Sequence, residues 1–130
     1  MVIDTSALIA ILLGEPEAEP LARAIANDPK KLISAFTALE ASIVIEAKKG
    51  EAGGRELDLL LHHARIEIVA MNSEQYEIAR AAWRTYGKGR HPAGLNIGDC
   101  CSYALANYSG EPLLFKGDDF AETDVLSVSW

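Results

Sequence analysis

Short apolar segments that alternate with longer helix-type segments are the feature that most constrains the fold of this chain. The strand-type segments cover residues 1–3, 32–35, 66–69, 113–115 and 125–128. Helical spacing of apolar residues, with capping and stop residues at the ends, predicts helices over residues 7–13, 17–26, 37–48, 54–64, 73–86 and 96–107. Strands separated by helices form a mostly parallel sheet that is covered on both faces. The sequence therefore predicts an α/β fold of three layers, α/β/α, around a central sheet of four to five strands.

The length and composition limit the class of protein. The 130 residues are enough for one domain, so we expect a single domain over residues 1–130. The longest apolar stretch, residues 7–13, is far below the roughly 18 residues of a membrane span, and no cationic segment precedes it. We therefore expect a cytoplasmic protein with no membrane partner. Cys100 and Cys101 are expected to be buried free thiols, because a disulfide between neighbours would be strained.

The negative charges are concentrated in a few residues. The formal net charge is −7, which at first argues against a nucleic-acid partner, because phosphate binding normally relies on Lys and Arg. Five acids account for most of the excess, since the charge becomes −2 without Asp4, Glu40, Asp99, Asp118 and Asp119. Acids that are neutralised by a bound metal ion are compatible with an anionic substrate.

These five acids are predicted to meet at one edge of the sheet. Asp4 directly follows the first predicted strand, Glu40 lies within two turns of the helix after the second, and Asp118 and Asp119 follow the fourth. Asp99 lies in the first turn of its helix, which faces the same edge. Carboxylates a few ångström apart repel one another unless they share a cation. Mg²⁺ or Mn²⁺, which prefer oxygen ligands, are therefore the expected cofactors.

Each acid also has a purely structural explanation. Asp4 is placed to cap the following helix, Thr37 and Glu40 spell a T-x-x-E capping box, and Asp99 is favourable at any helix N-terminus. Acids after Gly117 are common in turns. The shared metal site is favoured because all of the positions point to one end of the sheet. A cation there would activate water for phosphodiester hydrolysis without a covalent nucleophile.

Four segments resemble a known family. They are V-I-D-T-S-A at residues 2–7, L-E-A-S at 39–42, G-L-N-I-G-D-C at 94–100 and L-L-F-K-G-D-D-F at 113–120. In this order and at these separations they resemble the PIN-domain ribonucleases, specifically the VapC-type toxins of bacterial toxin–antitoxin pairs. The resemblance runs over essentially the whole chain.

The resemblance implies a role for each acid. Asp4 and Asp99 would be the principal metal ligands of an Mg²⁺- or Mn²⁺-dependent endoribonuclease, and Glu40 and Asp119 would complete the set of four acids. Ser6 would support Asp4 or a metal-bound water. Asp118 is the more variable neighbour of Asp119, and which of the two is the fourth acid stays open.

The family also implies partners. The chain is expected to form a homodimer, to cut RNA, and to bind a cognate antitoxin that inserts a C-terminal segment, often with an Arg, into the acidic groove. Basic residues near the site are candidates for contacts with RNA phosphates. These candidates are Lys88, Arg90, His91 and Lys116.

Three other classes of protein share part of this pattern. A haloacid-dehalogenase-like phosphatase also places an Asp after the first strand, but it needs an Asp at position 6, where this chain has Ser6. A receiver-type signalling domain needs a phosphoacceptor Asp after the third strand, where Met71 and Asn72 stand instead. A catalytically idle interaction module would not need the full set of acids.

Overall fold

A parallel sheet forms the centre of the molecule. The computed structural model describes residues 1–130. Its sheet has four parallel strands in the order β3-β2-β1-β4. The central strand β1 (Val2–Ile3) lies between β2 (Leu32–Ser34) and β4 (Leu113–Leu114), and β3 (Glu67–Val69) forms one edge. The predicted α/β class and parallel sheet are confirmed.

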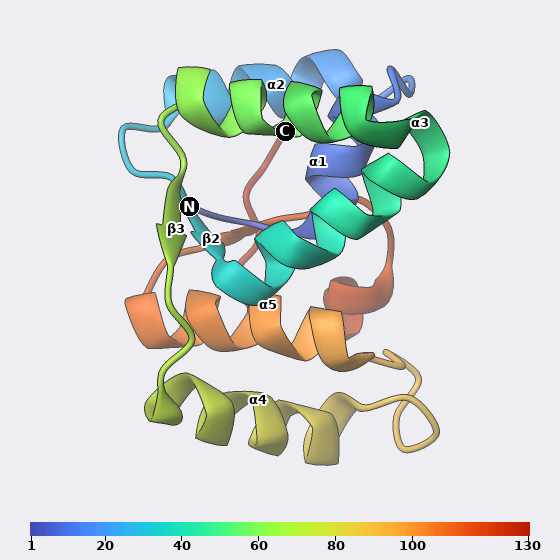
Figure 1. Cartoon of the computed structure of the whole chain (residues 1–130). Coiled ribbons are helices and arrows are strands. Elements are labelled where there is room, and N and C mark those ends of the chain that lie inside the picture. Colours follow the sequence, from blue (N-terminus) through green and yellow to red (C-terminus); the bar gives the residue numbers. More distant parts are fainter.

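Helices cover both faces of the sheet, as predicted for three layers. One face carries α1 (Thr5–Leu12), α2 (Ala18–Asn27) and α3 (Ala35–His63). The other face carries α5 (Ile97–Ser109), and α4 (Ser73–Tyr86) packs against the outer side of α5 (Figure 1). The sequence-based bounds of α1, α2, α4 and α5 agree with the structure to within a few residues.

Alternate residues of the central strand point into two separate apolar cores. Val2 packs with Leu105 and Leu113 in the core under α4 and α5. Ile3 packs with Leu8 in the core under α1, α2 and α3. A strand buried on both faces has this alternation because successive side chains point to opposite sides. The buried strand fixes the position of the residue that follows it, which is Asp4.

The helix α3 bends sharply where the sequence predicts two helices. Gly50 has φ 67° and ψ −164°, which is not helical, and the helix resumes directly afterwards. The part of α3 after Gly50, which we call the second arm, lies close to the part before it, the first arm. A Cβ on Gly53 would lie only 2.9 Å from the carbonyl oxygen of Ile45. Lys49 joins the arms by an ion pair to Glu56 at 3.0 Å. The predicted break at Gly50 is therefore confirmed, whereas the predicted gap before residue 54 is wrong.

The predicted fifth strand over residues 125–128 is wrong. This segment makes one isolated parallel bridge, between Ser127 and Leu113. The backbone N–H of Leu113 donates to Leu126 at 2.7 Å, and that of Val128 donates to Leu113 at 3.0 Å. Because β4 is only two residues long, it offers no further partners for a longer ladder.

No helix of this structure has the length and apolar character needed to span a bilayer.

Candidate active site

Asp4 lies at the carboxyl end of β1 with its side chain almost fully enclosed, since the residue is 4% exposed. Its Oδ2 accepts hydrogen bonds from the backbone N–H of Ser6 at 3.0 Å and from the Ser6 hydroxyl at 2.7 Å. Its Oδ1 accepts a hydrogen bond from the Ser102 hydroxyl at 2.6 Å. Asp4 is also the N-cap of α1, as its structural explanation predicted.

The carboxylate of Glu40 points toward α1 and α5. The Thr5 hydroxyl donates a hydrogen bond to Glu40 Oε1 at 2.5 Å. A Cβ on Gly98 would lie only 2.3 Å from Glu40 Oε2. Glu40 can therefore lie against the first turn of α5 only because residue 98 has no side chain.

The predicted capping box between Thr37 and Glu40 is wrong. The helix α3 begins before Thr37, and its N-cap is Ser34, whose hydroxyl accepts a hydrogen bond from the backbone N–H of Phe36 at 3.3 Å. Thr37 is fully buried, and its hydroxyl lies 3.2 Å from that of Ser102. The carboxylate of Glu40 is therefore free of a capping role and faces the other acids.

Asp99 lies in the first turn of α5 and is half-buried. The N-cap Asn96 and Asp99 form a reciprocal capping box, with hydrogen bonds of 2.9 and 3.0 Å. Burial raises the pKa of Asp99 to about 6, and the negative charges of Asp4, Asp119 and Glu40 add to the rise, although the backbone hydrogen bond from Asn96 opposes it. Three carboxylates from separate parts of the chain therefore lie close enough to Asp99 for their charges to act on it.

Asp118 and Asp119 lie on the segment after β4, and both are exposed. Asp119 begins a short 3-10 helix, η1 (Asp119–Glu122), which is anchored by the buried Phe120 packing against Phe115 at a centroid distance of 5.1 Å. Only Asp119 of the two contributes to the raised pKa of Asp99. The electrostatics therefore favour Asp119 over Asp118 as the fourth acid.

Lys116 is held by acids of the loop between α1 and α2. Its ammonium forms ion pairs with Glu15 and, at 3.2 Å, with Glu17. Its backbone N–H donates to the Ser6 hydroxyl at 3.0 Å, so the chain after β4 is tied to the residue beside Asp4. Lys116 therefore has a structural role next to the acids, and its charge is already paired.

The basic loop between α4 and α5 is ordered by its own contacts. The Arg90 guanidinium lies 4.8 Å from the ring centroid of Trp83, and its Nε donates to a backbone carbonyl at 3.3 Å. His91 Nδ1 accepts a backbone hydrogen bond within the loop at 3.0 Å. Lys88 borders an apolar groove between α4 and the start of α5. Contact with RNA remains a prediction for all three.

Sequence reasoning missed three hydroxyl residues at the site: Thr5, Thr37 and Ser102. Thr5 and Ser102 donate hydrogen bonds to the acids, and Thr37 contacts Ser102. One signal was available for Ser102, which follows Asp99 by three residues and therefore lies on the same side of a helix. Its contact with Asp4, 98 residues away, could be found only from the fold.

The donor set fits a hard divalent cation. All four acids offer carboxylate oxygens, and the ammonium of Lys116, which follows β4 as Asp119 does, is paired with other acids. No three Asp, Glu, His or Cys side chains are close enough to form a ligand group by themselves. Mg²⁺ needs only one or two carboxylates, because water and substrate phosphate fill the remaining positions. Two of the acids would therefore be enough to hold Mg²⁺.

A family comparison decides what kind of domain this is. The family described as "PIN domain" matches residues 1–126. The chain belongs to the PIN-domain family. The prediction from the four sequence segments is therefore confirmed.

Curated relatives of this PIN domain carry ribonuclease names. The chain is 58% identical to "Ribonuclease VapC30" of Mycobacterium tuberculosis over 129 residues, which are 99% of this chain and 98% of the relative. It is 60% identical to "Ribonuclease VapC" of Mycolicibacterium smegmatis over 128 residues, which are 98% of this chain and 99% of the relative.

Solved structures agree with the PIN fold. VapC20 of Mycobacterium tuberculosis, described as a "Sarcin-Ricin loop cleaving toxin", matches with a TM-score of 0.78 at 17% identity, covering 98% of this chain and 97% of the other. A "Toxin-antitoxin complex from Klebsiella pneumoniae" matches with a TM-score of 0.75 at 20% identity, covering 98% and 95%. At these identities the likeness supports the fold alone.

An apolar groove of about 480 Å³ borders the acidic edge of this PIN domain. It lies between α4 and the start of α5, and Phe36 of α3 lines it together with Trp83 and Ile97. Ile97 is 70% exposed, and on α3 Leu39 and Ile43 are 59% and 61% exposed. We call Phe36, Leu39, Ile43, Trp83 and Ile97 the apolar face. These five side chains are uncharged, and two basic residues, Arg80 and Lys88, also line the groove.

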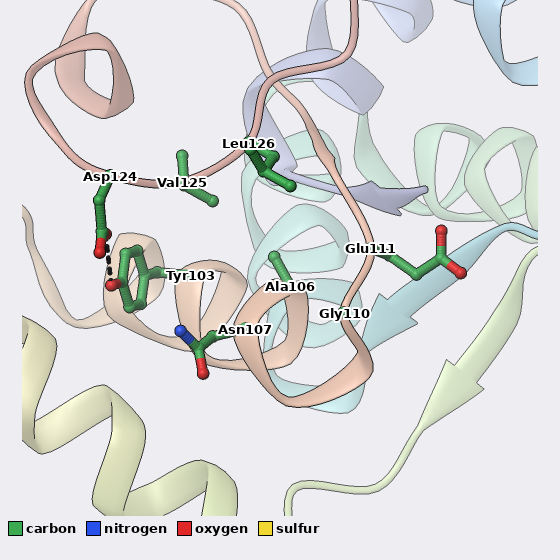
Figure 2. Close-up of a pocket in the computed structure, with 8 residues that line it drawn as sticks. All are labelled: Tyr103, Ala106, Asn107, Gly110, Glu111, Asp124, Val125 and Leu126. Carbon is green, nitrogen blue, oxygen red and sulfur yellow. Dashed lines mark hydrogen bonds between the residues drawn. The ribbon is translucent and has the colours of Figure 1, made fainter.

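A smaller hollow of about 190 Å³ lies toward the other end of α5 (Figure 2). The Tyr103 hydroxyl donates a hydrogen bond of 2.6 Å to Asp124, which ties the C-terminal segment to α5. Burial and the neighbouring Asp124 raise the pKa of Tyr103. None of the four acids of the candidate site lines this hollow, so it is separate from the predicted chemistry.

Proposed function

We propose that this chain is the ribonuclease toxin of a toxin–antitoxin pair and that it hydrolyses RNA phosphodiesters with bound Mg²⁺ or Mn²⁺. One arrangement carries the proposal: Asp4 contacts α5 through Ser102, and the Glu40 carboxylate lies against Gly98, next to Asp99 in the first turn of α5. The charges of Asp4, Glu40 and Asp119 accordingly add to the rise in the pKa of Asp99. Mutual repulsion of this kind is costly unless a cation is shared. The curated relatives are named as ribonucleases, and these names support the same activity.

Each residue has a role that follows from its position. Asp4 and Asp99 would hold the cation, and Glu40 and Asp119 would complete its negative surroundings and accept hydrogen bonds from coordinated water. When bound, the cation supplies an activated water and neutralises charge at the scissile phosphate. Ser6 holds Asp4 through its hydroxyl and its backbone N–H.

Cleavage of RNA in the presence and absence of the metal tests this proposal. The purified protein is incubated with total RNA and Mg²⁺, Mn²⁺ or EDTA. We expect cleavage with either metal, none with EDTA, and a loss of at least about 100-fold in Asp4→Asn and Asp99→Asn. Asp58→Asn, an exposed acid on the second arm of α3, is the control and should cleave normally. Cleavage that survives EDTA would overturn the metal-dependent mechanism.

The partner proposed for the acidic edge is an antitoxin segment that carries an Arg. A guanidinium can pair with a carboxylate in place of the cation, and pairing of this kind would inhibit the enzyme without changing its fold. One of the solved structures with this fold is described as a toxin–antitoxin complex. An Arg-containing peptide from the cognate antitoxin should inhibit cleavage, and the same peptide with Gln in place of Arg should not.

We also propose a homodimer that buries the apolar face. Leu39, Ile43 and Ile97 of this face are all more than half exposed, and large exposed apolar side chains beside a groove are typical of an interaction surface. Because the apolar face carries no charge, it is complementary to itself across a two-fold axis, whereas the acidic edge suits a basic segment. Arg90 and Lys116 are engaged within the chain, and Lys88 borders the groove beside the apolar face, so a contact of Lys88, Arg90, His91 or Lys116 with an RNA phosphate remains a prediction. The cytoplasmic location expected from the sequence remains part of this proposal.

A further inference from the structure

Two buried hydroxyl groups lie near Asp4 Oδ1, the carboxylate oxygen that Ser6 does not contact. Ser102 on α5 and Thr37 on α3 are both fully buried. The Ser102 hydroxyl lies 2.6 Å from Asp4 Oδ1, and the Thr37 hydroxyl lies 3.2 Å from that of Ser102. A chain of hydrogen bonds therefore joins three separate elements: α3, α5 and the end of β1.

Chemistry fixes the direction of this chain. An ionised carboxylate accepts hydrogen bonds and cannot donate them, so the single proton of the Ser102 hydroxyl is used on Asp4. The hydroxyl of Thr37 must therefore donate to Ser102. Each bond in such a chain polarises the next one, which strengthens the bond to the carboxylate.

The same arrangement occurs on the other oxygen of Asp4. The Ser6 hydroxyl donates to Oδ2, and it accepts a hydrogen bond from the backbone N–H of Lys116 at 3.0 Å. Each oxygen of Asp4 therefore accepts a hydrogen bond from a hydroxyl that itself accepts a hydrogen bond from another group. The two supports come from different parts of the chain, so they can be removed separately.

The hydrogen bonds also limit which oxygen of Asp4 is available. A carboxylate has about four acceptor positions, two on each oxygen. On Oδ2 both are used, by the N–H and the hydroxyl of Ser6. On Oδ1 one is used by Ser102. The single remaining position is on the oxygen that Ser102 holds.

We propose that Ser102, supported by Thr37, is a positioning residue that orients Asp4 so that Oδ1 is its one metal-binding oxygen. This inference rests on the proposed metal-dependent function. Without the Ser102 hydroxyl the Asp4 carboxylate can rotate. Metal binding would then have to order this side chain, and the free-energy cost of ordering it would lower the metal affinity. Groups that hold a metal ligand typically change metal affinity by about 10- to 100-fold.

Titration of the purified protein with Mn²⁺, followed by calorimetry, tests the inference without measuring cleavage. We expect Ser102→Ala to weaken Mn²⁺ binding by about 10- to 100-fold. Thr37→Val, which removes the hydroxyl but keeps the shape, should weaken it less, and Thr37→Ser, which keeps the hydroxyl, should restore wild-type affinity. In cleavage assays the Mn²⁺ concentration for half-maximal rate should rise in Ser102→Ala, while the rate at saturating Mn²⁺ recovers.

The outcomes separate the inference from the proposed function. If wild type binds Mn²⁺ and Ser102→Ala binds it equally well, the positioning role is overturned and the proposed function is untouched. If Ser102→Ala and Thr37→Val lower the melting temperature in EDTA but leave Mn²⁺ affinity unchanged, their hydroxyls are merely structural and the inference is again overturned. If wild type itself binds no Mn²⁺, the proposed function fails and the inference fails with it.

Discussion

Asp4 caps α1 and also lies at the candidate metal site. Its Oδ2 satisfies the first turn of the helix, and its Oδ1 faces Ser102. The structural and the functional explanations of this residue are therefore compatible, because the two oxygens serve different partners. Asp99 combines the same two roles through its capping box with Asn96. Helix capping fixes these carboxylates in place before any metal binds.

Gly98 is required for the position of Glu40. We expect Gly98→Ala to displace the Glu40 carboxylate, because the new Cβ would lie 2.3 Å from Oε2. RNA cleavage should fall by at least about 10-fold, whereas the free energy of unfolding should change by less than about 1 kcal/mol, since Ala favours a helix. The control is Gly54→Ala, also in a helix, whose Cβ would meet the carboxyl group of Glu46. Equal activity of the two variants would contradict this role of Gly98.

The raised pKa of Asp99 predicts a pH dependence of stability in EDTA. The pKa of Asp99 is about 6 in the folded protein, against about 3.9 in an unfolded chain, so the folded state binds the proton more tightly. This contribution to stability is present at low pH and is lost as the pH rises through about 6. Wild type should therefore lose stability relative to Asp99→Asn between pH 5 and pH 7.5 in urea unfolding. A difference that does not change with pH would contradict the expected repulsion.

The residues of the site were predictable to different degrees. The four acids could be predicted because each is close in sequence to a strand end or a helix start. The hydroxyls of Thr37 and Ser102 could not, because their partner Asp4 is distant in sequence and any helix carries many Ser and Thr residues. The incorrect capping box at Thr37 has a related cause, since residues 34 and 35 were assigned to a strand, whereas α3 begins at Ala35 with Ser34 as its N-cap.

At the level of elements, the order of strands and helices was predictable, but the pairing of the segment at 125–128 with the edge of the sheet was not. Apolar segments buried on both faces, such as β1, are evident from composition alone. The segment at 125–128 has a strand-like composition but makes only one bridge, because its neighbour β4 is short. Strand length depends on the partner, and a single sequence does not reveal it.

The end of α3 provides a prediction about stability. Arg65 follows the helix with φ 56°, and its exposed side chain has no role in either proposal. A left-handed conformation costs an L-residue roughly 1 kcal/mol, and glycine avoids that cost. We expect Arg65→Gly to raise the free energy of unfolding by about 0.5 to 1 kcal/mol. Arg65→Ala keeps the strain and should show no gain, and an equal gain in both variants would point to the lost charge instead.

At the level of the whole molecule, the apolar face predicts the oligomeric state. We expect the wild-type chain to be a dimer by light scattering and Ile43→Lys, on the apolar face, to be a folded monomer. Leu59→Lys is the matched control, because Leu59 is 57% exposed on the second arm of the same helix, outside the apolar face. A dimer that persists in Ile43→Lys but dissociates in Leu59→Lys would place the interface elsewhere.

The organisation of the whole molecule brings four distant acids to one edge of the sheet, and we propose that two of them, Asp4 and Asp99, hold one cation between them. The most direct measurement is the thermal stability of wild type, Asp4→Asn and Asp99→Asn with and without millimolar Mn²⁺. A ligand that binds only the folded state raises the melting temperature. Wild type should gain several degrees with Mn²⁺, and each variant should lose most of that gain. An equal gain in all three proteins, or no gain in wild type, would contradict a cation held jointly by Asp4 and Asp99.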